Sequence, residues 1–252
     1  MAKIGYVGLS DKEISAGAVP EEMSRKYLGG RGMGAYLLYN HVPKGIDPLS
    51  PENALIFSSG FLSGYFATAY GRCHVAGKSP DTGIYGDSNF GGAFGAELKY
   101  ANFGHLVIKG KADRPTYLYV HDGDIEVRDA SHLWGLDTYE TQLRICDELK
   151  DPEVKIACIG PPGENLVRFA CIRSWMKRAA GRTGQGCLMG SKNLKAVVIR
   201  GTGGLPVAHP EKLLGITKSQ YDFAIRTKIF QINSRWSNLF AWVVNNERES
   251  LA

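Results

Sequence analysis

The sequence has few cysteines and no long apolar run. Its five cysteines are widely separated, and no two form a Cys-x-x-Cys pair: Cys73, Cys146, Cys158, Cys171 and Cys187. This spacing favours reduced, mostly buried thiols over a disulfide framework or a cysteine-ligated metal centre. No apolar segment approaches the ~18 residues that cross a bilayer, and the N-terminus lacks the apolar block of a secretory signal. We therefore expect a cytoplasmic protein.

The sequence also lacks a block of like charge and a complete nucleotide-binding motif. The net charge is +5, but lysine and arginine are interleaved with acidic residues, which disfavours nucleic acid as a partner. The segment Gly71–Ser79 ends in Gly-Lys-Ser, yet its first glycine is one residue too distant for a P-loop. Gly190 follows Gly184-x-Gly186 one residue too late for a dinucleotide fingerprint.

What the sequence does contain is the composition of a globular protein, with 44% hydrophobic and 22% charged residues. Periodicity and turn residues predict strands and helices in irregular alternation, which favours an α+β fold over a doubly wound parallel one. An amphipathic helix over 137–150 would bury Leu143, Cys146 and Leu149. The other main elements are strands over 3–9, 54–57 and 154–159, a helix over 20–28, a long loop over 60–71, and a hairpin of 116–120 with 125–128.

An internal repeat relates two segments of the chain. Gly95–Gly110 contains Asn102 and ends in an apolar strand with Lys-Gly, whereas Gly186–Gly201 contains Asn193 at the same offset and ends in Arg-Gly. In each copy a glycine-rich loop leads through a short helical turn into a strand. We therefore predict a tandem duplication about a pseudo-twofold axis, which places the two glycine-rich loops face to face.

Three glycine-rich stretches, Gly29–Gly34, Asn89–Gly95 and Gly181–Gly186, are either ordinary turns or ligand-binding loops. Glycine lets the backbone N–H groups approach phosphates and flat heterocycles closely. Arginines accompany the second and third stretches, and their guanidinium groups suit anionic oxygens, although surface ion pairs are the alternative. These arginines are Arg72, Arg178 and Arg182.

Four titratable residues lie near these loops without forming a ligand set. His74 and His105 have no partner at metal-ligand spacing, so structural roles are favoured for both. Asp87 and Glu97 are candidate acid/base groups, but a single carboxylate beside a glycine run is a weak signal.

Several motifs together resemble the aldehyde:ferredoxin oxidoreductase family. The resemblance runs in consistent order over roughly residues 3 to 210. It is carried by Ser50-Pro51-Glu52-Asn53, Lys78-Ser79-Pro80-x-Thr82-Gly83, Gly91-Gly92-x-Phe94-Gly95-Ala96-Glu97-Leu98-Lys99, Asp129-Ala130-Ser131-His132-x-Trp134-Gly135, Ile159-Gly160-Pro161-x-Gly163-Glu164-Asn165-Leu166-Val167, Arg178-Ala179-Ala180-Gly181-Arg182 and Met189-Gly190-Ser191-Lys192-Asn193-Leu194-Lys195-Ala196.

The resemblance implies a two-repeat, pseudo-twofold α+β sheet domain that forms the base for tungstopterin. This cofactor is a tungsten or molybdenum bis-pterin whose phosphates are bridged by magnesium. By motif, Arg72 would lie between the pterin and a 4Fe–4S cluster. Asn89 and Ala179 would offer backbone carbonyls to the magnesium, and the remaining pterin and phosphate contacts would come from Gly91, Arg178, Gly181 and Arg182.

The resemblance also implies a domain division, partners and an activity. Residues 1–208 would form the tungstopterin-binding domain, and residues 209–252 would begin a helical domain cut short. The family's four cluster cysteines are absent here, so we expect a homo-oligomer or a partner chain carrying the helical half. The expected activity is oxidation of an aldehyde-type substrate to the acid, with electrons passing through the cluster to ferredoxin or another electron-transfer protein. The alternative is a scaffold or assembly domain that keeps the fold without the cofactor.

Overall fold

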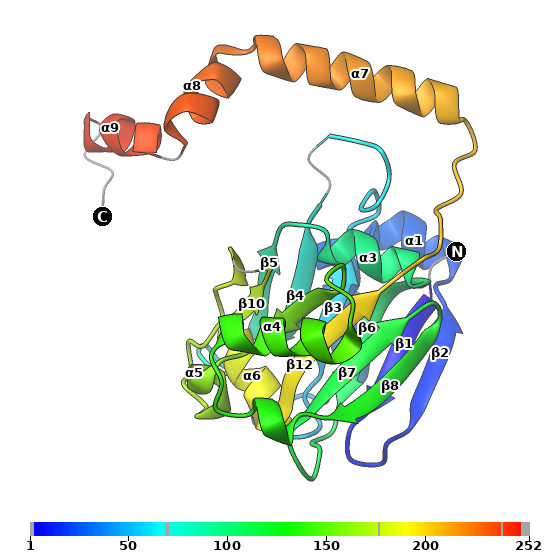
Figure 1. Cartoon of the computed structure of the whole chain (residues 1–252), viewed down its shortest axis with the longest axis vertical. Coiled ribbons are helices and arrows are strands. Elements are labelled where there is room, and N and C mark those ends of the chain that lie inside the picture. The colour runs from blue at the N-terminus through cyan, green and yellow to red at the C-terminus, as the bar shows by residue number, and fades with distance from the viewer. Residues whose placement is uncertain (1–2, 69–70, 176, 238, 248–252) are drawn as a thin grey trace. The chain divides into compact units, whose positions relative to one another are not determined.

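The computed structural model describes residues 3–68, 71–175, 177–237 and 239–247. The chain divides into two compact units (Figure 1). One comprises Met1–Tyr65 with Tyr70–Leu205, and the other comprises Phe66–Ala69 with Pro206–Ala252.

The first half of the larger unit forms a six-stranded mixed sheet. Its strands lie in the order β2-β1-β6-β3-β4-β5, in which β1 and β6 are parallel and the other pairs are antiparallel. The strand bounds are β1 Lys3–Gly8, β2 Ile14–Ala18, β3 Leu55–Ser59, β4 Cys73–Lys78, β5 Tyr85–Phe90 and β6 Phe103–Lys109.

The second half repeats this arrangement in a second six-stranded sheet. Its order, β11-β10-β9-β12-β7-β8, is that of the first sheet when read from the other end, with β7 replacing β1 and β12 replacing β6. As in the first half, the strand that comes first along the chain, β7, is the parallel neighbour of the strand that comes last, β12. The bounds are β7 Thr116–His121, β8 Asp124–Asp129, β9 Lys155–Cys158, β10 Ile172–Ser174, β11 Arg178–Ala180 and β12 Leu194–Arg200.

The helix before the last strand of each half confirms the predicted duplication. Helix α3, Phe94–Tyr100, precedes β6 at the same spacing at which α6, Gln185–Ser191, precedes β12. Asn102 and Asn193 both take a left-handed conformation in the turn between helix and strand, with φ of 71° and 55°. Asparagine tolerates this conformation better than most residues, which explains its presence in both copies.

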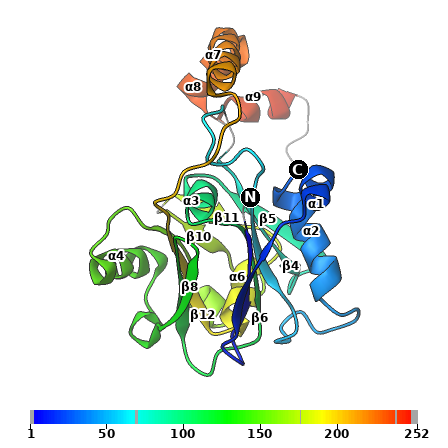
Figure 2. The same ribbon diagram turned by 90° about the vertical axis from the view of Figure 1, so that its right-hand side faces the viewer.

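Central strands are buried on both faces, because the sheets pack face to face and carry helices outside. Leu55 and Phe57 of β3 join a core shared by the two sheets, whereas Ile56 faces the opposite side. In β12, Val197 joins this shared core and Val198 faces outward. Figure 2 shows α2, Gly30–His41, and α4, Thr138–Leu149, on opposite flanks of the paired sheets. The remaining helices of this unit are α1 Glu21–Tyr27, the 3-10 turn Ser131–Leu133 and α5 Pro161–Glu164.

The predicted amphipathic helix is α4, but part of its predicted apolar face is wrong. Ile145 is fully buried under the second sheet, with Cys146 and Leu149 partly buried beside it. Leu143 remains 47% exposed. Leu143 lies two residues before Ile145, and residues two apart on a helix point in different directions, so burying one turns the other outward.

The smaller unit is helical. Its helices are α7 Pro210–Arg226, α8 Lys228–Trp236 and α9 Leu239–Glu247. Within this unit the Thr217 hydroxyl donates to the Phe66 carbonyl at 2.7 Å. Leu239 and Trp242 are exposed, whereas the side chains of Phe240, Val243 and Val244 lie outside the described residues. No helix in the described part is both long and apolar enough to span a bilayer.

Candidate functional site

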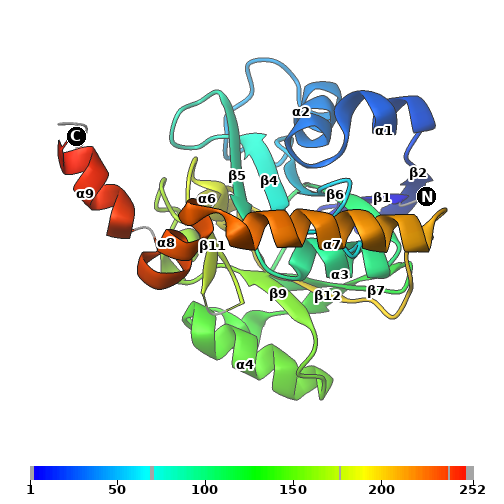
Figure 3. The ribbon, with the colours of Figure 1, turned by 90° about the horizontal axis from the view of Figure 1, so that it is seen from above.

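The two sheets meet where strand β5 of the first half lies against β11 of the second (Figure 3). The Arg182 backbone N–H donates to the Ser88 hydroxyl at 3.2 Å, and the Ser79 hydroxyl donates to the Thr183 carbonyl at 2.9 Å. Asn89 follows Ser88 directly. The structure therefore brings the second and third glycine-rich stretches together, although about ninety residues of sequence separate them.

Arg72 belongs to the same region through strand pairing. It precedes β4, whose residue His74 pairs with Asn89 of β5. The Arg72 guanidinium donates to the side-chain oxygen of Asn89 at 2.5 Å. A Cβ added at Gly71 would lie 3.0 Å from the Gly92 carbonyl oxygen, so the loops around Arg72 and Gly91-Gly92 touch. Arg72 is thus held at this edge by a side chain that the sequence reasoning did not assign to it.

The glycines of this region separate into two physical classes. A Cβ added at Gly91, Gly92 or Gly181 would meet nothing within 4 Å. In contrast, a Cβ at Gly184 would overlap the Arg168 carbonyl, and one at Gly186 would approach the Ala170 carbonyl oxygen to 2.7 Å. Packing within the chain therefore requires Gly184 and Gly186. Gly92 has φ of 101°, a backbone conformation that favours glycine, whereas neither packing nor backbone conformation gives a reason for Gly91 or Gly181.

The first glycine-rich stretch is structural. It forms the start of α2, where Gly29 and Gly30 have φ of 78° and 52°. A Cβ at Gly29 would lie 2.6 Å from the Ser59 carbonyl oxygen, and one at Gly32 would overlap the Tyr27 carbonyl. Left-handed backbone and close approach both demand glycine. Local backbone conformation and packing therefore account for the glycines of this stretch.

Exposed arginines surround the open glycines. Arg72, Arg178 and Arg182 are all exposed, and none of them forms an ion pair with another described residue. Elsewhere in the described chain, arginines such as Arg31 and Arg200 are paired with carboxylates at 2.6 to 3.1 Å. The site thus combines uncovered backbone with uncompensated positive charge, a combination that suits a polyanionic ligand.

A salt-bridge cluster lies on the neighbouring part of β4 and β5. Arg31 of α2 donates to Asp87 at 2.6 Å, and the His74 Nδ1 lies 3.6 Å from the same carboxylate. Burial lowers the pKa of His74, and the nearby Asp87 opposes that shift. Asp87 is therefore an ion-pair partner that joins α2 to the sheet, which weakens its case as an acid/base group.

Glu97 and His105 also make structural contacts, as predicted for the histidine. The Glu97 carboxylate accepts from the Arg200 guanidinium at 3.1 Å and from the Gly201 N–H at 3.0 Å, joining α3 to the end of β12. His105 is buried with its Nδ1 2.8 Å from the Ser58 hydroxyl, and burial lowers its pKa to about 4. It is accordingly neutral at pH 7.

Buried lysines are the polar residues whose roles the sequence reasoning missed. The Lys192 ammonium donates to the carbonyls of Asn53 at 2.6 Å, Gly110 at 3.1 Å and Pro51 at 3.3 Å. Lys195, fully buried, pairs with Glu164 and donates to the Leu136 carbonyl at 2.8 Å. Both lysines belong to motifs that carry the family resemblance. These motifs therefore include residues that hold distant segments of the fold together.

The cysteines are free thiols, as expected. Burial raises the pKa of Cys73 and of Cys158 to about 12 in each case. A thiol with such a pKa stays protonated at neutral pH and is a poor nucleophile or metal ligand.

Comparison with known proteins agrees with this architecture. Residues 4–201 match the family model described as the aldehyde ferredoxin oxidoreductase N-terminal domain. A tungsten-containing aldehyde ferredoxin oxidoreductase of Pyrococcus furiosus is 47% identical over 214 residues, which cover 85% of this chain and 35% of that protein. The WOR-like subunit of an aliphatic sulfonate oxidoreductase from the same organism is 34% identical over 234 residues, covering 87% and 37%.

A solved structure shares the fold. The active-site complex BamBC of benzoyl coenzyme A reductase, in complex with 1,5-dienoyl-CoA, matches with a TM-score of 0.86 and 40% identity, over 88% of this chain and 34% of that one. The chain therefore spans about a third of the length of these relatives. With matching sheet topology and a family match over most of its length, the chain belongs to the aldehyde ferredoxin oxidoreductase family through that family's N-terminal domain.

Proposed function

We propose that this chain supplies the tungstopterin-binding part of an oxidoreductase acting on an aldehyde-type substrate. One observation carries the proposal. Gly91, Gly92 and Gly181, from different halves of the duplicated fold, all face open space beside the exposed arginines of the β5–β11 junction. A side chain at Gly91 or Gly181 would occupy the space that a ligand needs, and neither packing nor backbone conformation explains the lack of one there. At Gly92 the φ of 101° already favours glycine.

The donors of this region fit a phosphorylated pterin. Arg178 and Arg182 would pair with phosphate oxygens, to which a guanidinium can donate two parallel hydrogen bonds. Gly91 and Gly181 would let the flat heterocycle lie against the backbone. We further propose that the backbone carbonyls of Asn89 and Ala179 coordinate the magnesium, since hard cations prefer oxygen ligands.

Arg72 would act beside the pterin with its side chain held by Asn89. A guanidinium fixed by a 2.5 Å hydrogen bond loses less conformational entropy when it meets an anionic or sulfur-rich group than a free one does. When bound, the tungsten and its dithiolenes would supply the redox chemistry, and the protein would supply placement and charge.

Metal content tests this proposal. The protein would be purified anaerobically from a tungsten-grown host, with any co-purifying subunit retained, and analysed for tungsten, molybdenum and pterin. We expect Gly91→Val and Gly181→Val to lower tungsten content at least fivefold while leaving the melting temperature unchanged, because their added atoms enter open space.

Gly204→Val is the matched control, since its Cβ also meets nothing within 4 Å but lies outside the site. Metal content that is unaffected by the two site variants would refute the placement of the cofactor. Absence of tungsten and molybdenum from the unsubstituted protein would favour the alternative, a scaffold or assembly domain that retains the fold alone.

The activity and the electron acceptor rest on the relatives. Their names include both an aldehyde ferredoxin oxidoreductase and a sulfonate oxidoreductase, so we propose aldehyde oxidation with transfer to ferredoxin as the first activity to assay. The 4Fe–4S cluster of that electron path would take its cysteine ligands from another polypeptide or domain, because the five cysteines here lack the required spacing.

A further inference from the structure

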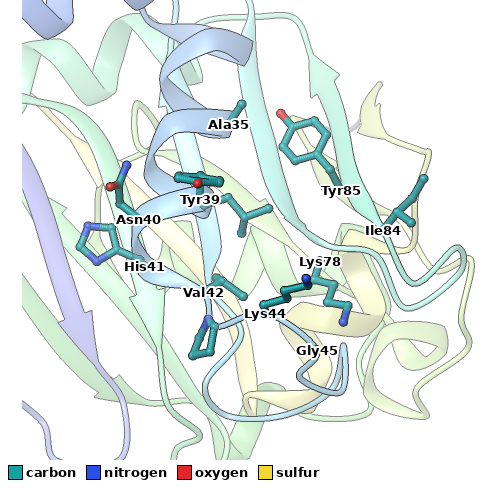
Figure 4. Close-up of a pocket in the computed structure, with 12 residues that line it drawn as sticks. Ala35, Tyr39, Asn40, His41, Val42, Lys44, Gly45, Lys78, Ile84 and Tyr85 are labelled. Carbon is teal, nitrogen blue, oxygen red and sulfur yellow. The ribbon is translucent and has the colours of Figure 1, made fainter.

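A second concave site lies on the larger unit, between the end of α2 and the hairpin that joins β4 to β5. Its volume is about 800 Å³, within the range of small-molecule sites. The principal lining residues come from these two segments: Leu38, Val42, Lys44, Lys78, Ile84 and Tyr85. All of these except Leu38 are labelled in Figure 4. None of them belongs to the proposed cofactor site.

The pocket has an apolar floor and an exposed apolar rim. Leu38 is buried in the cluster under the first sheet, with Val42 packed beside it. At the rim, Ile84 and Tyr39 are 69% and 88% exposed. A ligand with an apolar body would therefore remove from water side chains that the fold leaves uncovered.

The polar groups of the pocket carry positive charge or donate hydrogen bonds. Lys44 and Lys78 line it, no aspartate or glutamate does, and neither lysine is ion-paired within the described residues. The Lys78 ammonium donates one hydrogen bond, to the Ile46 carbonyl at 2.5 Å. Burial raises the pKa of Tyr85 to about 12, which keeps its phenol protonated and able to donate.

His41 adds no cation at neutral pH. Burial and the nearby Lys109 both lower its pKa, so the imidazole is neutral there. The positive charge of the pocket therefore comes from the two lysines, and a neutral or cationic ligand would leave both uncompensated.

The pocket and the cofactor site lie at opposite ends of the same two strands. Lys78 and Tyr85 end β4 and begin β5, whereas Cys73 and Phe90 at their other ends adjoin Arg72 and Gly91. Five residue steps along a strand span roughly 17 Å. One ligand of drug-like size would not bridge the two sites.

We propose that this pocket binds a small carboxylate with an aromatic or branched apolar body. The carboxylate would lie against Lys44 and Lys78, and the apolar body would cover Leu38, Val42 and Ile84. We assign this ligand class because the pocket combines an apolar floor with two lysines that form no ion pair with a described residue, and because no aspartate or glutamate lines it. It does not depend on whether the protein holds tungstopterin.

Fluorine NMR with para-fluorobenzoate as the probe tests the proposal on the full chain. We expect saturable binding, and at least tenfold weaker binding of para-fluorobenzyl alcohol, which has the same ring without the charge. Lys44→Gln should weaken para-fluorobenzoate binding about threefold, whereas Lys111→Gln, an exposed lysine outside the pocket, should leave it unchanged.

Ala35→Trp provides a steric test, because Ala35 lines the pocket from α2 and an indole there would fill it. This variant should abolish probe binding while circular dichroism shows an unchanged melting curve. Binding that survives Ala35→Trp would overturn the proposal, as would equal affinity for the acid and the alcohol. Failure of the probe to bind the unsubstituted chain would overturn it too, and would leave another protein surface as the occupant of the rim.

Discussion

At the residue scale, the buried polar side chains of this protein join segments that are distant in sequence. His105 meets Ser58 across neighbouring strands, Glu97 meets Arg200 across the two halves, and Lys192 contacts carbonyls of the first half. His105, Glu97 and Lys192 are buried, so each contributes to stability only while its partners remain in place. Protonating or substituting one of these side chains should therefore change the free energy of unfolding, which can be measured.

His105 should make the protein sensitive to acid. Its pKa is about 4 in the folded state and 6.5 when unfolded, so the unfolded chain binds more protons between these values. The contribution of the neutral imidazole is complete above pH 6.5 and is lost as the pH falls toward 4, by up to about 3 kcal/mol. Chemical denaturation at pH 7 and pH 4.5 measures the loss.

His105→Gln should reduce this acid sensitivity, whereas His209→Gln, at an exposed position, should not. An identical pH dependence in the protein and in His105→Gln would show that this histidine is not the responsible group.

Lys192→Met should destabilise the fold by about 3 kcal/mol or more. The variant keeps most of the side-chain volume but leaves the carbonyls of Pro51, Asn53 and Gly110 without their buried donor. Lys111→Met, on the surface, should change the free energy of unfolding by less than about 0.5 kcal/mol. Equal effects of the two substitutions on urea denaturation would contradict this interpretation of Lys192.

At the element scale, α4 is positioned by its N-terminal cap and by one fully buried apolar side chain. Asp137 caps α4 by accepting from the N–H groups of Tyr139 and Glu140 at 2.7 and 2.8 Å, which sets where the helix begins. The packing of α4 against the second sheet then depends on Ile145. Periodicity predicted the helix because its polar and apolar residues recur at helical spacing. The same pattern placed Leu143 on the buried face, because periodicity does not distinguish one apolar residue from another.

Paired alanine substitutions measure this difference. Ile145→Ala should destabilise the protein by about 2 to 4 kcal/mol, because it opens a cavity under α4. Leu143→Ala removes a similar number of atoms from a half-exposed position and should cost less than about 1 kcal/mol. Thermal or urea denaturation distinguishes them, and a larger effect at Leu143 would contradict the orientation of the helix.

At the scale of the whole molecule, the larger unit is two copies of one structure with a shared core. Phe57 and Leu106 from the first sheet belong to the same buried cluster as Leu118 and Val197 from the second. The Ser79–Thr183 hydrogen bond and the contacts of Lys192 cross the same boundary. Neither half covers its own inner face, so we infer that the halves depend on one another for folding.

Separate expression of residues 1–112 and 113–252 tests this dependence. Each fragment alone should give the poorly dispersed amide spectrum of an unfolded or aggregated chain, because its inner sheet face is exposed. Mixing or co-expression should restore the spectrum of the intact chain. A fragment that unfolds cooperatively by itself would show that one half carries an independent core.

Sequence alone determined the strands over 3–9, 54–57 and 154–159, the hairpin turning at Asp122-Gly123, the duplication and the family, because these depend on local periodicity, turn chemistry and repeated spacing. Strands β2, β4, β5, β10 and β11 were not predicted. Tertiary structure decided which glycines are required by packing and which face open space. It also decided that Glu97 and Asp87 are held in ion pairs and that Lys192 and Lys195 are buried. The physical reason is that a residue's role in contacts depends on neighbours that are distant in sequence, as with Arg31 and Asp87 or Lys192 and Asn53. Spacing within one segment carries no information about such neighbours.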